Sequence, residues 1–105
     1  MSSENSSLDV GDLADLAEGA MRHVDGMCPH GVVVCRVNGE VRAFDDDCSH
    51  RDARLSEGRL RGTVVTCPSH GARFDVIDGR HLGPPAATPI VVRRVEVVEG
   101  RHIVS

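Results

Sequence analysis

The sequence predicts an all-β protein, a small antiparallel sandwich or barrel, and three observations support this class. Sixteen of its 105 residues are Val, and they are concentrated in short runs. Val is stiff at its first side-chain torsion and packs well on pleated sheets. Gly-containing pairs that are typical of hairpin turns separate these runs. Helical spacing is confined to one short segment, and the length suits a single domain over residues 1–105.

The expected elements follow in order along the chain. Residues 1–6 are Ser-rich and acidic, which is typical of a mobile tail. A short strand is expected at residues 8–10, followed by a connector at 11–18 in which Leu13 and Leu16 are spaced for one or two helical turns. Later strands are expected at residues 31–37, 40–45, 63–66, 73–77, 90–98 and 102–104. The hairpin signals are Asp25-Gly26, Asn38-Gly39, Arg61-Gly62, Asp78-Gly79 and Glu99-Gly100.

Polar, turn-rich stretches interrupt this pattern at residues 46–62 and 68–72, and a further loop is expected at 83–89. Long loops inside a compact domain are usually functional or disordered. The first two open with a Cys and a His, in the boxes Cys48-Ser49-His50 and Cys67-Pro68-Ser69-His70. A hairpin through Arg61-Gly62 would return the chain and bring the two boxes side by side, so that four metal ligands could converge.

With these boxes in place, the chain resembles the Rieske [2Fe–2S] family, and its small soluble ferredoxins more closely than its membrane-complex subunits. The flanking marks of the resemblance are Leu55-Ser56-Glu57-Gly58, Gly71, Phe74-Asp75, Gly79 and Pro84-Pro85. The resemblance implies one [2Fe–2S] cluster per chain, with Cys48 and Cys67 on the inner iron and His50 and His70 on the outer iron. It also implies a base of antiparallel strands and a loop-rich cluster-binding subdomain over about residues 46–87.

The ligand types of the family have an electrostatic consequence. Two ferric ions and two sulfides sum to +2, so two thiolates and two neutral imidazoles make a neutral oxidised site that accepts an electron readily. High-potential members carry two further Cys in the ligand loops, where this chain has Ala53 and Ser69, and a Tyr, which this chain lacks altogether. Fewer hydrogen bonds to sulfur predict a potential in the lower half of the Rieske range.

The function implied by the resemblance is single-electron transfer, as in the ferredoxin components of bacterial ring-hydroxylating dioxygenase systems. Such a carrier takes electrons from a flavin-dependent reductase, delivers them to a terminal oxygenase and is not itself an enzyme. A length of 105 residues also argues against a complete enzyme with a cofactor fold and a substrate pocket. A monomer is expected.

Charge and hydropathy bear on partners and location. The net charge of −4, with Arg as every basic residue, argues against nucleic acid as a partner. No apolar run approaches the length of a membrane span, and the beginning lacks the features of a signal peptide. A soluble cytoplasmic protein that does not bind membranes is expected.

Two other functions use the same residues. A small Rieske subunit of a nitrite-reductase-like complex would share the cluster but would bury a large apolar face against its partner. A zinc-stabilised interaction module would use the same four ligands without redox activity. A mononuclear iron oxygenase would need two more His and a carboxylate around open positions, and the remaining His residues show no such grouping.

Several residues near the boxes have more ordinary interpretations. Cys28-Pro29-His30 is a C-x-H box without a partner box at the required distance, and it suits a hairpin loop. Cys35 is expected to be a buried thiol, although a disulfide with Cys28 is an alternative. Asp45-Asp46-Asp47 is expected to be a solvated turn, with an acidic patch that steers a redox partner as the alternative. Pro84-Pro85 is either a stiff linker or part of a loop that covers the cluster.

Overall fold

The computed structural model describes residues 7–27, 29–48, 53–69, 71–84 and 88–105. Within these ranges every regular element is a strand except one short 3-10 helix, η1 (Leu55–Glu57), and all strand pairs are antiparallel. The predicted all-β class is therefore confirmed. No helix in the described ranges has the length and apolar character needed to cross a membrane. The expected tail, residues 1–6, lies outside the described residues.

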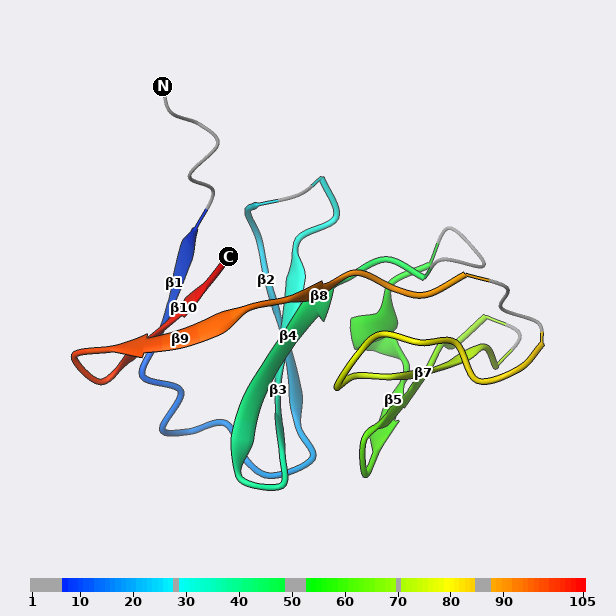
Figure 1. Ribbon diagram of the computed structural model, residues 1–105, viewed down its shortest axis with the longest axis horizontal. Helices are drawn as coiled ribbons and strands as arrows, with labels where there is room; N and C mark the ends of the chain where they lie inside the picture. The colour runs from blue at the N-terminus through cyan, green and yellow to red at the C-terminus, as the bar shows by residue number, and fades with distance from the viewer. Residues whose placement is uncertain (1–6, 28, 49–52, 70, 85–87) are drawn as a thin grey trace.

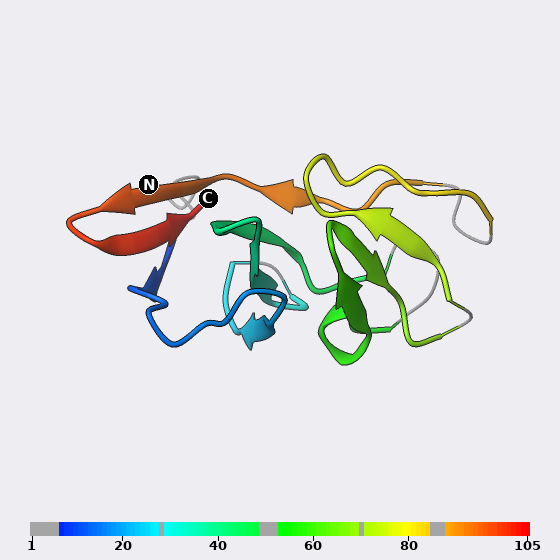
Figure 2. The same cartoon turned by 90° about the horizontal axis from the view of Figure 1, so that it is seen from below.

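The strands form three sheets that follow one another along the long axis of the molecule (Figures 1 and 2). The first sheet has the order β1 (Leu8–Gly11), β10 (Arg101–Val104) and β9 (Val95–Val98). The central sheet has the order β2 (Met21–Val24), β3 (Val32–Val37), β4 (Glu40–Asp45) and β8 (Val92–Arg93). The third, small sheet has the order β5 (Arg59–Arg61), β6 (Val64–Thr66) and β7 (Arg73–Asp75).

Three of the five predicted hairpin signals lie at turns between paired strands, whereas Asp25-Gly26 begins a longer loop between β2 and β3 and Asp78-Gly79 follows β7 without a paired strand directly after it. Asn38-Gly39, which joins β3 to β4, has positive φ at both residues, 54° and 79°. Two positive φ values define the tight turn whose twist matches that of the flanking strands. Glu99-Gly100 repeats this geometry between β9 and β10. Arg61 ends β5, and Gly62 begins the turn that leads to β6.

Two of the expected elements differ in the structure. Residues 11–18 do connect two sheets, but they form separate turns and no helix, because Leu13 has a left-handed φ of 57° that interrupts a right-handed helix. The expected strand at residues 90–98 is divided into β8 and β9. It is divided at Arg94, whose backbone N–H and C=O both bond to Ser105.

The core has two apolar clusters on opposite faces of β3. Alternation along a strand places Val33 and Cys35 on one face and Val34 on the other, and all three are fully buried. The first cluster joins the central sheet to the small sheet through Phe44 and Phe74. The small sheet, whose strand β6 leads into the second ligand loop, is thereby fixed against β4, which leads into the first, and this contact positions the site.

Candidate metal centre

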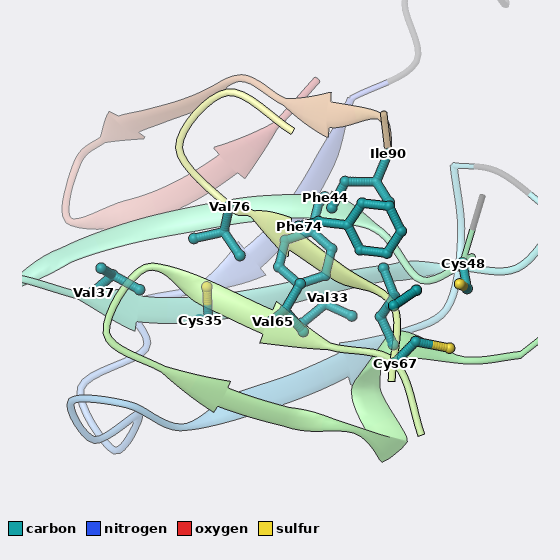
Figure 3. Packing of buried hydrophobic residues seen from close by; sticks show 12 residues of the cluster. Val33, Cys35, Val37, Phe44, Cys48, Val65, Cys67, Phe74, Val76 and Ile90 are labelled. Carbon is teal, nitrogen blue, oxygen red and sulfur yellow. The ribbon is translucent and has the colours of Figure 1, made fainter. Parts of the chain in front are cut away.

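Cys48 and Cys67 come together at one end of the first core cluster (Figure 3). Cys48 follows β4 by three residues and Cys67 directly follows β6, so each lies where a strand gives way to a loop. Their exposed fractions are 4% and 1%, and their side chains lie close enough for Cys48 to affect the pKa of the Cys67 thiol. The fold therefore brings two buried sulfur donors to one point, as the sequence predicts.

The two ligand loops are closed in the same way. The backbone N–H of Cys48 donates to the carbonyl oxygen of Ala53 at 3.0 Å, and that of Cys67 donates to Ala72 at 2.7 Å. Each bond spans five residues, and each of the two boxes begins at the residue that donates it. The same five-residue Cys-to-Ala interval can be read in both boxes of the sequence.

The two predicted imidazole ligands, His50 and His70, lie outside the described residues. Within the described ranges no group of three or more His, Cys, Asp or Glu side chains is placed to hold a metal ion. The structure thus brings together the two predicted thiols and does not place the two imidazoles.

The chemistry of the two thiols suits a soft metal. The pKa of the Cys67 thiol is raised to about 11, chiefly by burial; the backbone N–H of Ser69 lowers it by donating to the sulfur, and the nearby Cys48 side chain raises it. The raised pKa keeps the Cys67 thiol neutral without a nearby positive charge, and a bound cation reverses that preference because it deprotonates a coordinating thiol. Iron is a cation that this donor set fits.

Cys35 lies in the same cluster but has a different role. It is a fully buried free thiol in the middle of β3, and burial raises its pKa to about 12. The prediction of a buried thiol is confirmed, and the alternative disulfide is not formed. Cys28 lies outside the described residues. His30 is exposed, with its Nε2 3.8 Å from Asp47 Oδ2, within the loop between β2 and β3.

Neither interpretation of Asp45-Asp46-Asp47 describes all three residues. Asp45 receives two hydrogen bonds from the Arg93 guanidinium, at 2.6 and 3.0 Å. Asp46 is fully buried, and only Asp47 has an exposed side chain. The interpretation as a uniformly solvated turn is wrong for Asp45 and Asp46, and so is a three-charge acidic patch, because their carboxylates already have partners inside the fold.

The Asp45–Arg93 pair carries a testable prediction. We expect Asp45→Asn to lower the free energy of unfolding by about 1–2 kcal/mol, because Arg93 loses a two-point charged partner in a mostly buried setting. Asp47→Asn is the matched control and should change it by less than about 0.5 kcal/mol. Urea unfolding followed by circular dichroism measures both. Equal effects of the two substitutions would contradict the prediction.

Asp46 also belongs to a group of residues that the sequence does not predict to lie together. Its carboxylate contacts His23 of β2 and Ser56 of η1. The sequence offers a partial signal in the acidic residue two positions before Cys48. It offers none for His23, which lies 23 residues from Asp46 along the chain.

Three further predicted positions have different outcomes. Ala53 is partly buried and packs against the first core cluster, and Ser69 provides the N–H that bonds to Cys67. Pro84 is exposed, and Pro85 lies outside the described residues, so a covering role for this loop stays a prediction.

Comparison with known proteins gives consistent matches. The Rieske [2Fe-2S] domain model matches residues 6–98. The ferredoxin component of biphenyl 2,3-dioxygenase from Rhodococcus jostii (strain RHA1) is 46% identical over 77 residues, which cover 72% of this chain and 70% of that protein. Ferredoxin CarAc from Metapseudomonas resinovorans is 38% identical over 79 residues, which cover 75% of this chain and 74% of that protein.

Solved structures agree with the sequence matches. A chain in the complex of reduced oxygenase and oxidized ferredoxin in carbazole 1,9a-dioxygenase superposes with a TM-score of 0.88 at 37% identity, and covers 94% of this chain and 92% of that chain. The ferredoxin of Sphingomonas yanoikuyae B1 superposes with a TM-score of 0.86 at 30% identity, and covers 96% of this chain and 98% of that chain.

Proposed function

We infer, since this chain belongs to the Rieske [2Fe–2S] family, that Cys48 and Cys67 bind one iron of its cluster and that His50 and His70 bind the other. The observation that carries the assignment is the pair of buried thiols in contact at the bases of two loops that close identically. Each of these loops contains, in the sequence, one of the two histidines.

The protein is an electron carrier with a [2Fe–2S] cluster, like the ferredoxin components to which it is similar, and it is not itself an enzyme. We propose that it delivers single electrons to the terminal oxygenase of a dioxygenase system and receives them from a flavin-dependent reductase. The oxygenase role is supported by the named oxygenase–ferredoxin complex. These matches do not favour a nitrite-reductase-like subunit or a zinc module.

Residues around the proposed ligands influence the cluster by hydrogen bonding to sulfur and by excluding water. The Ser69 N–H donates to the Cys67 sulfur, and such hydrogen bonds stabilise the negative charge that an added electron brings. Phe44, Phe74 and Ile90 fill the core behind the thiols and keep water from that side. The cluster, when bound, supplies the one-electron redox chemistry.

We propose that residues 46–87 form the cluster-binding part of a single domain. The support is that this range contains η1, the small sheet and both closed loops, while the other two sheets form the base.

We also propose that the protein works as a cytoplasmic monomer, since a carrier that alternates between partners needs small, reversible contacts.

The reduction potential is expected to lie in the lower half of the Rieske range of about −150 to +300 mV, and about +150 mV is the limit that it should not exceed. The physical reason is that Ala53 and Ser69 occupy the positions of the extra disulfide and that no Tyr is available to donate to sulfur. Spectroelectrochemical titration at pH 7 measures the potential. A midpoint well above this limit would contradict the prediction.

One experiment tests the ligand set and the cofactor together. We expect the purified protein to contain two irons per chain, no stoichiometric zinc, and, after reduction with dithionite, a rhombic electron paramagnetic resonance signal typical of mixed His and Cys ligation. Stoichiometric zinc without a signal would overturn the assignment, because Zn²⁺ has a filled d shell and no redox activity.

A further inference from the structure

Asp46 is the one charged side chain that is fully buried in the described part of the chain, and it lies two residues before Cys48. Three hydrogen bonds hold its carboxylate. His23 Nδ1 lies 2.6 Å from Oδ2, the Ser56 hydroxyl donates to Oδ2 at 2.6 Å, and the Ser56 backbone N–H donates to Oδ1 at 2.8 Å. A buried carboxylate is retained only where such donors compensate for its lost hydration.

These bonds connect the two ends of the first ligand loop. Asp46 is at the loop's entry and Ser56 is beyond its exit, and between them Cys48 bonds to Ala53. The backbone N–H of Asp46 also donates to the carbonyl oxygen of Gly31 at 2.9 Å. A single carboxylate therefore holds the entry of the loop, its exit and the strand β2 together. We call His23, Asp46 and Ser56 the loop anchor.

The backbone near His23 is shaped to admit the imidazole ring. Gly31 has a φ of +79°, and a Cβ at this position would lie 2.5 Å from His23 Cε1. A side chain at residue 31 would collide with the ring, so the glycine and the histidine fit each other. This fit, together with the short bond to Asp46, indicates a built contact and not an incidental one.

Both ring nitrogens of His23 face carboxylates. Nε2 lies 2.8 Å from Asp25 Oδ1, and Nδ1 faces Asp46. Hydrogen bonds to Asp25 and Asp46 raise the pKa of His23 above its usual value. The protonated ring donates from both nitrogens, so it satisfies both carboxylates at once. Asp25 is nearly fully exposed, whereas Asp46 has no access to water.

We propose that His23 is a positioning residue for the cluster: it fixes the Asp46 carboxylate, which in turn closes the base of the loop that carries Cys48. The inference rests on the proposed ligand set, since it assigns His23 a role in holding that loop. The two ring nitrogens of His23 face Asp46 and Asp25. Its effect passes through Asp46 and the loop ends.

The test compares two substitutions of His23, each of which keeps the hydrogen bond of a different ring nitrogen. The amide of Asn takes the approximate place of Nδ1, so His23→Asn preserves a donor to Asp46. The longer Gln places its amide nearer Nε2, so His23→Gln preserves the contact with Asp25 and loses the one with Asp46. Asp25→Ala removes the exposed partner alone. His102→Gln is the matched control, since His102 bonds to Gly11 in the distant first sheet.

Two quantities are measured. The first is the rate at which the holoprotein loses its cluster in the presence of a chelator, monitored by visible absorbance. The second is the electron paramagnetic resonance spectrum of the reduced protein. We expect His23→Gln to lose the cluster about tenfold faster or more and to show shifted or broadened signals. His23→Asn should stay within about threefold of the unsubstituted protein, and Asp25→Ala and His102→Gln should match it. Equal behaviour of the Gln and Asn variants would overturn the proposal.

Ser56→Ala provides a second variant if His23→Gln fails to fold. It removes the hydroxyl bond to Asp46 and leaves the backbone bond, so we expect faster cluster loss with a folded chain. An unchanged rate would count against the loop anchor. If the unsubstituted protein binds iron but no variant of the loop anchor changes the rate of cluster loss, the positioning role alone would be overturned. An unsubstituted protein that binds no cluster would overturn the ligand set and this inference with it.

Discussion

Cys67→Ser is expected to abolish [2Fe–2S] binding, whereas Cys35→Ala is expected to retain it. Both residues are buried cysteines of the same core cluster, so burial alone does not distinguish them. Cys67 contacts a second thiol, receives an N–H from Ser69 and begins a closed loop. Cys35 lies in the middle of β3 with no second thiol beside it among the described residues. Serine oxygen is a poor substitute for thiolate toward iron–sulfur clusters.

The comparison is measured by iron content and visible absorbance of the two purified variants. Cys35→Ala leaves a small cavity and should lower the free energy of unfolding by about 1–2 kcal/mol without loss of iron. Urea unfolding checks that value. A Cys67→Ser variant that keeps a full complement of iron, or a Cys35→Ala variant that folds but loses it, would contradict the assignment.

The sequence predicted the parts of the fold that depend on local chemistry. Asn38-Gly39 forms its turn because two consecutive residues tolerate positive φ, and this is a property of the pair alone. The Val-rich runs became strands for a similarly local reason. The approach of the two thiols was predicted from the spacing of the boxes, because the ligands of one site must lie on loops that meet.

The misjudged residues depend on partners that lie far along the chain. Asp45 and Asp46 occur in a run of three acids that looks uniform, but their environments are set by Arg93, 48 residues away from Asp45, and by His23, 23 residues away from Asp46. Leu13 illustrates a different limit, because its left-handed backbone is imposed by the path between two sheets. A periodicity of three residues could not reveal that constraint.

Gly58→Ala is the second substitution with a large expected effect. A Cβ on Gly58 would lie 1.9 Å from the backbone carbonyl oxygen of Thr66 and 3.2 Å from that of Leu55. Thr66 is paired with Arg59 in the β5–β6 hairpin and directly precedes Cys67. Relief of the collision requires movement of backbone that is already hydrogen-bonded on both sides. We expect the free energy of unfolding to fall by about 3 kcal/mol or more.

Gly62→Ala separates this collision from an ordinary backbone effect. Gly62 lies in the same hairpin at a φ of +60°, and a Cβ there meets no atom within 4 Å, so only the left-handed conformation is penalised, at about 1–2 kcal/mol. The two variants are compared by urea unfolding and by the resonance spectrum of the reduced protein. Because Thr66 directly precedes Cys67, displacement of Thr66 in Gly58→Ala should also shift Cys67 and change the electron paramagnetic resonance spectrum. Gly62→Ala should leave that spectrum unchanged. The prediction would be contradicted if both variants lowered the free energy of unfolding equally and neither altered the spectrum. In that case β6 would move without disturbing Cys67, and the Leu55-Ser56-Glu57-Gly58 turn would not hold the second ligand loop in place.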